Sequence, residues 1–189
     1  MKRVALLFSA FLLVSCGSSS SSTLSCSQEY WDGDVGTCLP EQWDVLDAET
    51  LRQRGVPEET IVGFQLSQAV AGQFPTVAVT KEKLASVVKP LQYSEANIRS
   101  VEVLEGYQQI DLKDIDIDGE TVKLHVFSGQ PIDGQPGRRF YQVSTTSGDV
   151  GYTITAVTPL SIDNTLEKQV MLMIDHFTLQ QPDNEMTDK

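Results

Sequence analysis

The chain has 189 residues, of which 40% are hydrophobic, enough for one globular domain with a hydrophobic core. It carries 26 acidic and 14 basic residues, a net charge of −12 at pH 7. This excess of negative charge argues against nucleic acid and anionic lipid surfaces as partners, because both would be repelled.

The first fifteen residues have the features of a secretory signal peptide. Lys2 and Arg3 give a positive start, and the apolar run at 4–14 is too short to span a bilayer, which takes about 20 helical residues. A buried N-terminal strand or helix is the less favoured interpretation, because a serine-rich tract follows directly. Removing Lys2 and Arg3 with the signal leaves 12 basic residues against 26 acidic ones, a net charge of −14.

The end of this segment, Leu13-Val14-Ser15-Cys16, resembles the lipobox of bacterial lipoproteins. The resemblance implies cleavage before Cys16 and acylation of its thiol, so that the acylated N-terminal cysteine binds the lipid bilayer. The implied location is the bacterial cell envelope, outside the cytoplasm. Gly17 rather than aspartate follows the cysteine, which resembles cargo for the outer membrane of a host that has one. Residues 16–25 then form a serine-rich tether with a reach of roughly 15 Å.

Lipidation of Cys16 leaves Cys26 and Cys38 as a pair, which predicts a disulfide in an exported protein. Eleven residues lie between them, and closing this loop would contribute about 3 kcal/mol by a chain-entropy argument. A zinc site is the rival interpretation, but two cysteines alone cannot fill a tetrahedral shell. The spacing also differs from the C-x-x-C of redox pairs.

The first half of the folded region alternates short strands and helices. Trp43 and Val45 predict a strand near 43–46, Asp47 caps a helix at 48–54, and 61–67 and 76–80 read as strands. A second helix is expected to begin at Ser94 as N-cap, with Tyr93 and Ile98 as a hydrophobic staple, and to end before Gly106.

The second half predicts antiparallel strands and a closing helix. In the strand expected at 110–117, the alternation of apolar residues shifts by one position between Leu112 and Ile115. One extra residue would restore the alternation, which predicts a β-bulge at 113–114. Asp118-Gly119 predicts a tight turn to a strand at 121–127, and a glycine- and proline-rich loop follows at 128–137. A further hairpin pairs 140–145 with 150–157, and 177–179 could add an edge strand. The closing helix at 164–175 has one apolar stripe, formed by Leu166, Val170, Met173 and Phe177. A disordered tail is expected at 181–189.

This order predicts an α+β fold with an antiparallel β-sheet flanked by helices, in a single domain at 26–180. Six segments within 42–179 carry a family resemblance: Phe74-Pro75-Thr76-Val77-Ala78-Val79, the helix with Ser94, Ile115-Asp116-Ile117-Asp118-Gly119-Glu120, Arg139-Phe140-Tyr141-Gln142-Val143, Gly151-Tyr152-Thr153-Ile154-Thr155-Ala156 and Met171-Leu172-Met173-Ile174-Asp175-His176-Phe177-Thr178-Leu179. Through these segments the region 42–179 resembles the PsbP/DcrB-like superfamily, and 26–38 lies outside that resemblance. The resemblance implies an α/β/α sandwich and an accessory or binding protein without a shared active site.

The sequence offers no catalytic constellation, no cofactor motif and no complete metal-ligand set. His125 falls on a strand face with Lys123, and His176 at a helix end, where structural roles are favoured. The runs at 32–34 and 114–118 are rich in aspartate, which leaves calcium binding open, but they lack the converging oxygens of an EF-hand. Arg138 and Arg139 follow the 128–137 loop and are candidates for binding an anion or a partner carboxylate.

These features predict a non-catalytic, membrane-anchored lipoprotein that acts as a binding or assembly module for an envelope protein. The 128–137 loop is the first candidate contact surface. The alternative is a metal-binding protein or metal-dependent hydrolase, which requires His125, His176 and carboxylates to converge. A small-ligand carrier is a third hypothesis, and it requires an apolar cavity between sheet and helix.

Overall fold

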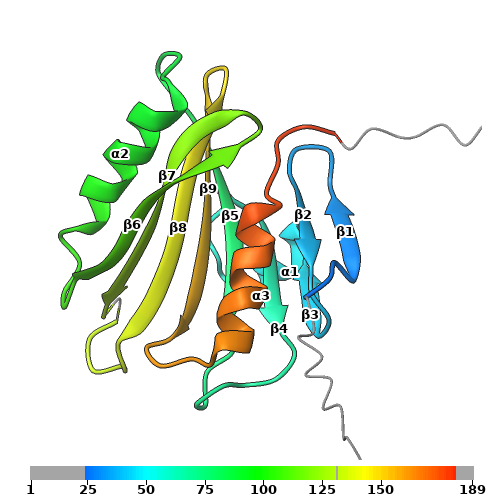
Figure 1. The fold of residues 1–189 in the computed structure, drawn as a ribbon, viewed down its shortest axis with the longest axis vertical. Helices are drawn as coiled ribbons and strands as arrows, with labels where there is room; N and C mark the ends of the chain where they lie inside the picture. Colours follow the sequence, from blue (N-terminus) through cyan, green and yellow to red (C-terminus); the bar gives the residue numbers. More distant parts are fainter. Residues whose placement is uncertain (1–23, 131, 182–189) are drawn as a thin grey trace, which may run out of the picture.

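The computed structural model describes residues 24–130 and 132–181 (Figure 1). The predictions for the signal peptide at 1–15, for Cys16 and for the tail at 182–189 lie outside the described residues.

The described residues form an antiparallel sheet of seven strands, in the order β3-β4-β5-β9-β8-β7-β6. A separate two-stranded sheet pairs β1 with β2, and three helices complete the fold (Figure 1). The α+β class with an antiparallel sheet flanked by helices is therefore confirmed. The strands are β1 Gln28–Trp31, β2 Gly36–Leu39, β3 Trp43–Leu46, β4 Thr60–Leu66, β5 Thr76–Lys83, β6 Gln108–Ile117, β7 Glu120–Gly129, β8 Arg138–Ser147 and β9 Val150–Pro159. The helices are α1 Ala48–Gln53, α2 Pro90–Val101 and α3 Asn164–Asp175.

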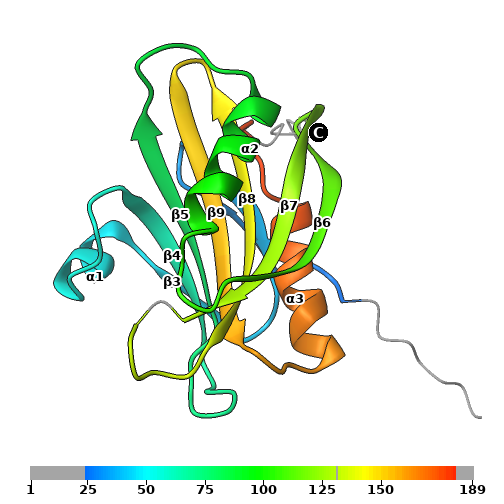
Figure 2. The same ribbon diagram turned by 90° about the vertical axis from the view of Figure 1, so that its left-hand side faces the viewer.

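Helix α3 covers one face of the large sheet, and α2 covers the opposite face (Figure 2). The Asp163 carboxylate caps α3 by accepting a hydrogen bond from the Leu166 amide at 2.8 Å. The predicted apolar stripe of α3 is buried along its whole length. It packs on inward side chains of the sheet, which include Val122, Leu124, Val143 and Ile154, and these contacts form the main core.

Helix α2 begins at Pro90, so the prediction that Ser94 caps it is wrong. Proline suits the first helical position because its φ is already helical and its missing N–H has no intrahelical partner there. Ser94 is buried one turn inside the helix, and its Oγ accepts a hydrogen bond from the Lys123 amide at 3.1 Å. Its hydroxyl joins α2 to the sheet instead of starting the helix.

Strand β6 contains the predicted β-bulge, but three residues earlier than expected. The register shifts between Gln109 and Asp111, so Ile110 is the extra residue rather than Lys113 or Asp114. The bulge brings Ile110 to the sheet face shared with Ile115, and Leu112 pairs with His125 on the other face. One irregular residue thus explains the change of phase.

The strands of the second half are longer than predicted, and the turns are where the sequence places them. Asp118 and Gly119 have φ angles of 53° and 86°, the left-handed conformations of a tight hairpin turn between β6 and β7. Strands β7 and β8 extend into the predicted 128–137 loop and shorten it to 130–137. The expected edge strand at 177–179 is reduced to a single bridge between Thr178 and Gly36.

The β1–β2 hairpin is fastened to the rest of the domain. Cys26 and Cys38 are joined by a disulfide, with 5.4 Å between their Cα atoms. Val35 and Leu39 are buried in the main core, and the Thr37 hydroxyl donates a hydrogen bond to the Met173 carbonyl at 2.6 Å. The segment outside the family resemblance therefore contributes to the same core.

Candidate functional site

The two histidines lie apart in the described structure. His125 is fully buried on the α2 face of β7, and its Nε2 lies 3.0 Å from the Tyr107 hydroxyl. Burial lowers its pKa, and the weaker influence of Glu102 opposes that shift. His176 is exposed at the carboxyl end of α3, with its Nδ1 3.0 Å from the Leu172 carbonyl. The convergence that a histidine-based metal site or hydrolase requires is not formed by this pair.

Asp32 and Asp34 both make polar contacts with other residues of the fold. Asp32 accepts hydrogen bonds from the amides of Asp34 and Val35, both at 2.9 Å, and so shapes the β1–β2 turn. Asp34 forms an ion pair with Lys81 at 2.7 Å.

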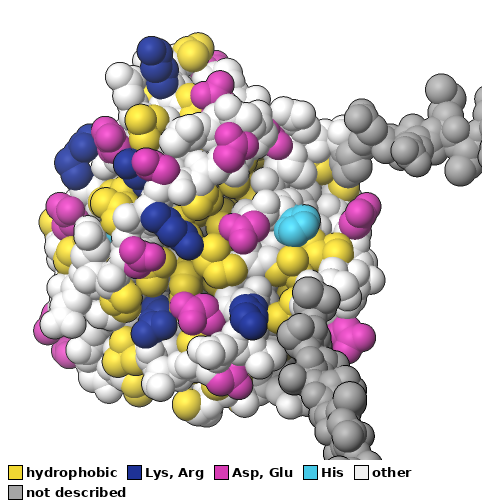
Figure 3. All heavy atoms as spheres, in the orientation of Figure 1, with side chains coloured by type: hydrophobic (Ala, Val, Ile, Leu, Met, Phe, Trp, Pro, Cys, Tyr) yellow, Lys and Arg dark blue, Asp and Glu magenta, His cyan; other side chains and the backbone are white. Residues whose placement is uncertain are grey.

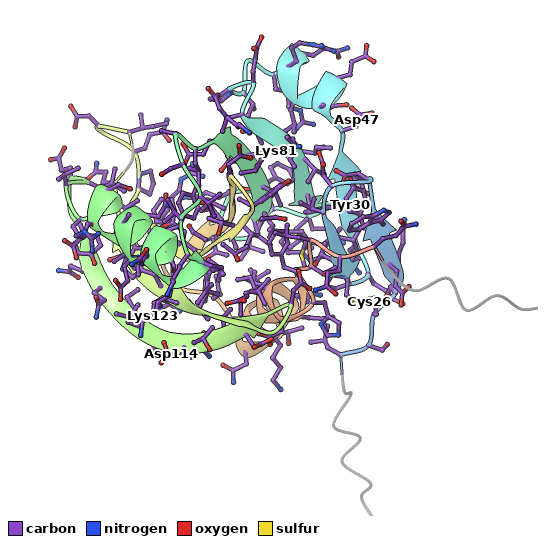
Figure 4. The ribbon with its side chains drawn as sticks, turned by 90° about the horizontal axis from the view of Figure 1, so that it is seen from above. Cys26, Tyr30, Asp47, Lys81, Asp114 and Lys123 are labelled. Carbon is purple, nitrogen blue, oxygen red and sulfur yellow. A yellow bond between two sulfur atoms is a disulfide. The ribbon has the colours of Figure 1, made fainter. Side chains whose placement is uncertain are left out.

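The aspartates at 114–118 also have structural partners. Asp114 pairs with Lys123 at 2.5 Å across the outer strands, as Figure 4 shows. Asp116 accepts a hydrogen bond from the Gly119 amide, and Asp118 accepts two from the C-terminal segment. Within 24–130 and 132–181, no three His, Cys, Asp or Glu side chains are grouped to hold a metal ion.

Three connections at one end of the large sheet carry exposed apolar side chains. Phe74 precedes β5, Leu160 follows β9, and Ile132 lies in the 130–137 loop, with exposed fractions of 49%, 48% and 53%. All three connections lie at the lower end of the molecule in Figure 1. Leu160 lies against Gly137, at the end of the 130–137 loop. We call these three residues the loop-end patch.

The structure separates the two candidate arginines. Arg138 and Arg139 are neighbours on β8, so their side chains project from opposite faces of the sheet. Arg139 reaches the α3 face, where its Nη1 lies 3.4 Å from the Tyr141 hydroxyl. The two therefore do not form one anion-binding pair.

A hollow of about 460 Å³ lies on the α3 face, between α3 and strands β6, β7 and β8. Figure 3 shows apolar side chains on this face beside α3, bordered by charged groups of both signs. We call this hollow the α3 groove, and it is lined by Ile110, Asp111, Lys113, Leu124, Val126, Arg139, Tyr141, Asn164, Glu167, Lys168 and Met171.

Tyr141 links the charged groups of the α3 groove. Its hydroxyl donates to the Glu167 carboxylate at 3.3 Å and receives the contact from Arg139. Burial raises the pKa of Tyr141, and the Arg139 guanidinium partly offsets that effect. The hydroxyl therefore stays protonated at neutral pH and holds Glu167 at the groove wall.

A second hollow of about 400 Å³ lies beside the disulfide and the carboxyl end of α3. Its lining includes Cys26, Tyr30, Thr37 and His176. Burial, together with neighbouring Asp32, raises the pKa of Tyr30. The lining therefore offers hydroxyl groups, one phenol ring and the disulfide, but no cluster of charges.

Sequence reasoning singled out Arg139 but missed the rest of the α3 groove. Its lining comes from β6, β7, β8 and α3, which are brought together only by the sheet order and the helix crossing. The one local signal of the groove was the shift in apolar alternation along β6, because it marks the bulge that brings Ile110 to the groove.

Comparison with known proteins gives structural likeness without sequence likeness. No family profile and no curated protein sequence matches the chain. The crystal structure of LpqN, involved in cell envelope biogenesis of Mycobacterium tuberculosis, has a TM-score of 0.61 at 18% identity, covering 82% of this chain and 91% of LpqN. Cyanobacterial PsbP from Synechocystis sp. PCC 6803 has a TM-score of 0.55 at 16% identity, covering 89% and 99%. A point mutant of the protein Mog1 has a TM-score of 0.51 at 15% identity, covering 80% and 95%.

These identities are low, so the comparisons establish the fold alone. No helix within the described residues is long and apolar enough to cross a membrane. The likeness to cyanobacterial PsbP and LpqN, with the seven-stranded antiparallel sheet and its flanking helices, shows that the chain has a PsbP/DcrB-like fold.

Proposed function

We propose that this protein is a lipid-anchored, non-catalytic module that binds an envelope protein through the loop-end patch. The observation that carries the proposal is that Phe74, Ile132 and Leu160 are exposed and lie in three connections at the same end of the sheet. Exposed apolar side chains that gather on rigid strand ends are typical of protein contact surfaces. The sequence suggests the 128–137 segment as a contact surface, and the part of it that remains a loop, 130–137, contributes Ile132.

Three further observations support the proposal. The lipobox-like Leu13-Val14-Ser15-Cys16 would hold the domain at a membrane on a short tether. The aspartate runs and His125 have structural partners within the described part of the chain, which favours binding over catalysis. LpqN, which shares the fold, is a protein involved in cell envelope biogenesis.

In-cell photo-crosslinking from single positions tests this function. A photoreactive amino acid replaces Ile132 in one variant and Val87 in a matched control, whose side chain is 74% exposed. Val87 follows the other end of β5, so it lies at the opposite end of the sheet from the loop-end patch. We expect a defined protein adduct from position 132, in the membrane fraction, and none from position 87.

The same strains with Cys16→Ala test the anchor. Without a thiol to acylate, the protein should leave the membrane fraction. Retention in membranes would refute the lipid anchor. Equal adducts from both positions, or none from position 132, would refute the loop-end patch as the contact surface.

A further inference from the structure

We propose that the α3 groove binds an amphiphilic monoanion, namely a carboxylate with a medium-length apolar tail. This goes beyond the protein contact proposed above, because it assigns a small-molecule ligand to a different surface. The groove is of a size that holds small ligands, for which volumes of roughly 300–1,000 Å³ are usual.

The floor of the groove suits an apolar tail. Leu124 and Val126 form its buried base, and half-buried Met171 closes it from α3. The bulge in β6 brings Ile110 to the rim, where 47% of its side chain is exposed. A methionine and an exposed isoleucine beside a buried floor allow the groove to adapt to a flexible hydrocarbon chain.

The rim carries three cations that make no ion pair with the described carboxylates: Lys113, Arg139 and Lys168. Three lysines outside the groove do pair with aspartates, in Lys81–Asp34, Lys83–Asp149 and Lys123–Asp114. The three cations at the rim thus surround one apolar hollow without such partners. Their position favours an anionic head group at the rim.

Arg139 is the group that would recognise the head. Its Nε is buried and has no hydrogen-bond partner among the described residues, and its Nη1 makes only the 3.4 Å contact to the Tyr141 hydroxyl. A buried guanidinium donor without an acceptor is costly, and a carboxylate can accept from two guanidinium nitrogens at once. A ligand carboxylate would therefore supply the hydrogen-bond acceptor that the Arg139 guanidinium lacks.

The two acids of the groove limit the charge of the ligand. Asp111 and Glu167 line the same hollow, and Tyr141 holds the Glu167 carboxylate near the head-group position. With the three cations Lys113, Arg139 and Lys168 against these two acids, the groove has a net charge of +1, which one negative charge on the ligand neutralises. One negative charge on an apolar tail is the combination that fits floor and rim together.

Octanoate is the probe for this site, and NMR titration of the full chain with Cys16→Ala is the measurement. That substitution removes the acylation site and changes no described residue. Octanoate should give saturable shifts at amides of β6 and α3 that line the groove. Octanamide, which lacks the charge, and acetate, which lacks the tail, should each bind at least about tenfold more weakly.

Two neighbouring arginines provide the matched variants. Arg139→Gln should weaken octanoate binding at least about tenfold, and Arg138→Gln, on the opposite sheet face, should leave it unchanged. Arg139→Lys keeps the positive charge but loses the forked guanidinium donors, so it should bind octanoate with intermediate affinity. Such an intermediate affinity would show that the weaker binding of Arg139→Gln reflects lost recognition rather than misfolding.

The inference is overturned by absent saturation, by equal binding of octanamide or acetate, or by shifts confined to the hollow beside the disulfide. Equal affinities of the Arg139→Gln variant and the protein with Arg139 for octanoate would overturn it as well. The crosslinking test uses positions outside the groove, so either proposal can fail while the other stands.

Discussion

His125 is the residue whose burial has the clearest thermodynamic consequence. It is fully buried under α2, with its ring stacked on Phe127 at 4.6 Å between centroids and its Nε2 facing the Tyr107 hydroxyl. Its Nδ1 has no hydrogen-bond partner among the described residues. The neutral ring therefore belongs to an aromatic cluster, where a positive charge would be poorly solvated.

This environment predicts a loss of stability in mild acid. The pKa of His125 is lowered in the folded state, so below about pH 6.5 the unfolded chain binds more protons and the free energy of unfolding falls. The slope from this one group is at most about 1.4 kcal/mol per pH unit. His125→Phe should keep the stacking and flatten the slope between about pH 5 and pH 7, as measured by urea unfolding.

Measurements at about pH 8, where the ring is neutral in both states, separate packing from titration. An identical pH dependence in wild type and His125→Phe would contradict the prediction. The sequence placed His125 on the correct face of its strand, but its burial depends on α2 and Tyr107, which no local pattern revealed.

At the scale of elements, helix α2 shows how a local rule can identify a helix and misplace its start. Ser94 and the Tyr93–Ile98 spacing satisfy a capping pattern, but Pro90 begins the helix, and Lys89 at the N-cap makes no side-chain cap bond. The capping residues are instead buried against the sheet, where Tyr93 and Ser94 hold α2 to its partner strands. These side chains therefore serve tertiary contacts with the sheet and do not cap the helix.

The contact of Tyr93 with Gly151 predicts how α2 depends on β9. A Cβ at position 151 would lie 2.9 Å from Tyr93 Cε2 and closer still to its Cζ and its hydroxyl oxygen. Gly151→Ala should therefore cost about 1–3 kcal/mol of unfolding free energy through overpacking, measured in urea. Gly129→Ala is the matched control, because its Cβ would meet only ordinary contacts, the nearest at 3.6 Å.

A double-mutant cycle identifies the cause. In a Tyr93→Ala background the steric conflict is gone, so Gly151→Ala should cost little. An equal cost with and without the Tyr93 ring would show that strand propensity, rather than the packing of α2, makes alanine unfavourable at position 151.

At the scale of the molecule, the sequence predicted the sheet and its hairpins better than it predicted surfaces. Turn residues and apolar alternation act over a few positions, so Asp118-Gly119 and the α3 stripe could be interpreted directly. The α3 groove joins β6 to α3 across more than fifty residues of sequence, and the loop-end patch joins three separate connections. Neither surface has a period or a motif, because only the topology assembles it.

Asp118 is the residue through which the ends of the fold are tied together. Its carboxylate accepts hydrogen bonds from the Thr178 hydroxyl at 2.5 Å and from the Leu179 amide at 2.7 Å. Thr178 in turn exchanges two backbone hydrogen bonds with Gly36, at 2.8 and 3.0 Å. One turn aspartate therefore supports the C-terminal segment that holds the β1–β2 hairpin.

This arrangement predicts a graded response at position 118. Asp118→Asn keeps a residue suited to a φ of 53° but leaves one acceptor oxygen, so it should cost about 1 kcal/mol. Asp118→Ala loses both acceptors and adds the strain of a left-handed backbone, so it should cost about 2–4 kcal/mol. Hydrogen exchange should rise at the Gly36 amide, which donates to Thr178, before it rises in central strand β8, because the segment would loosen locally. Equal costs for both substitutions, or unchanged exchange at Gly36, would show that the hairpin does not depend on this tie.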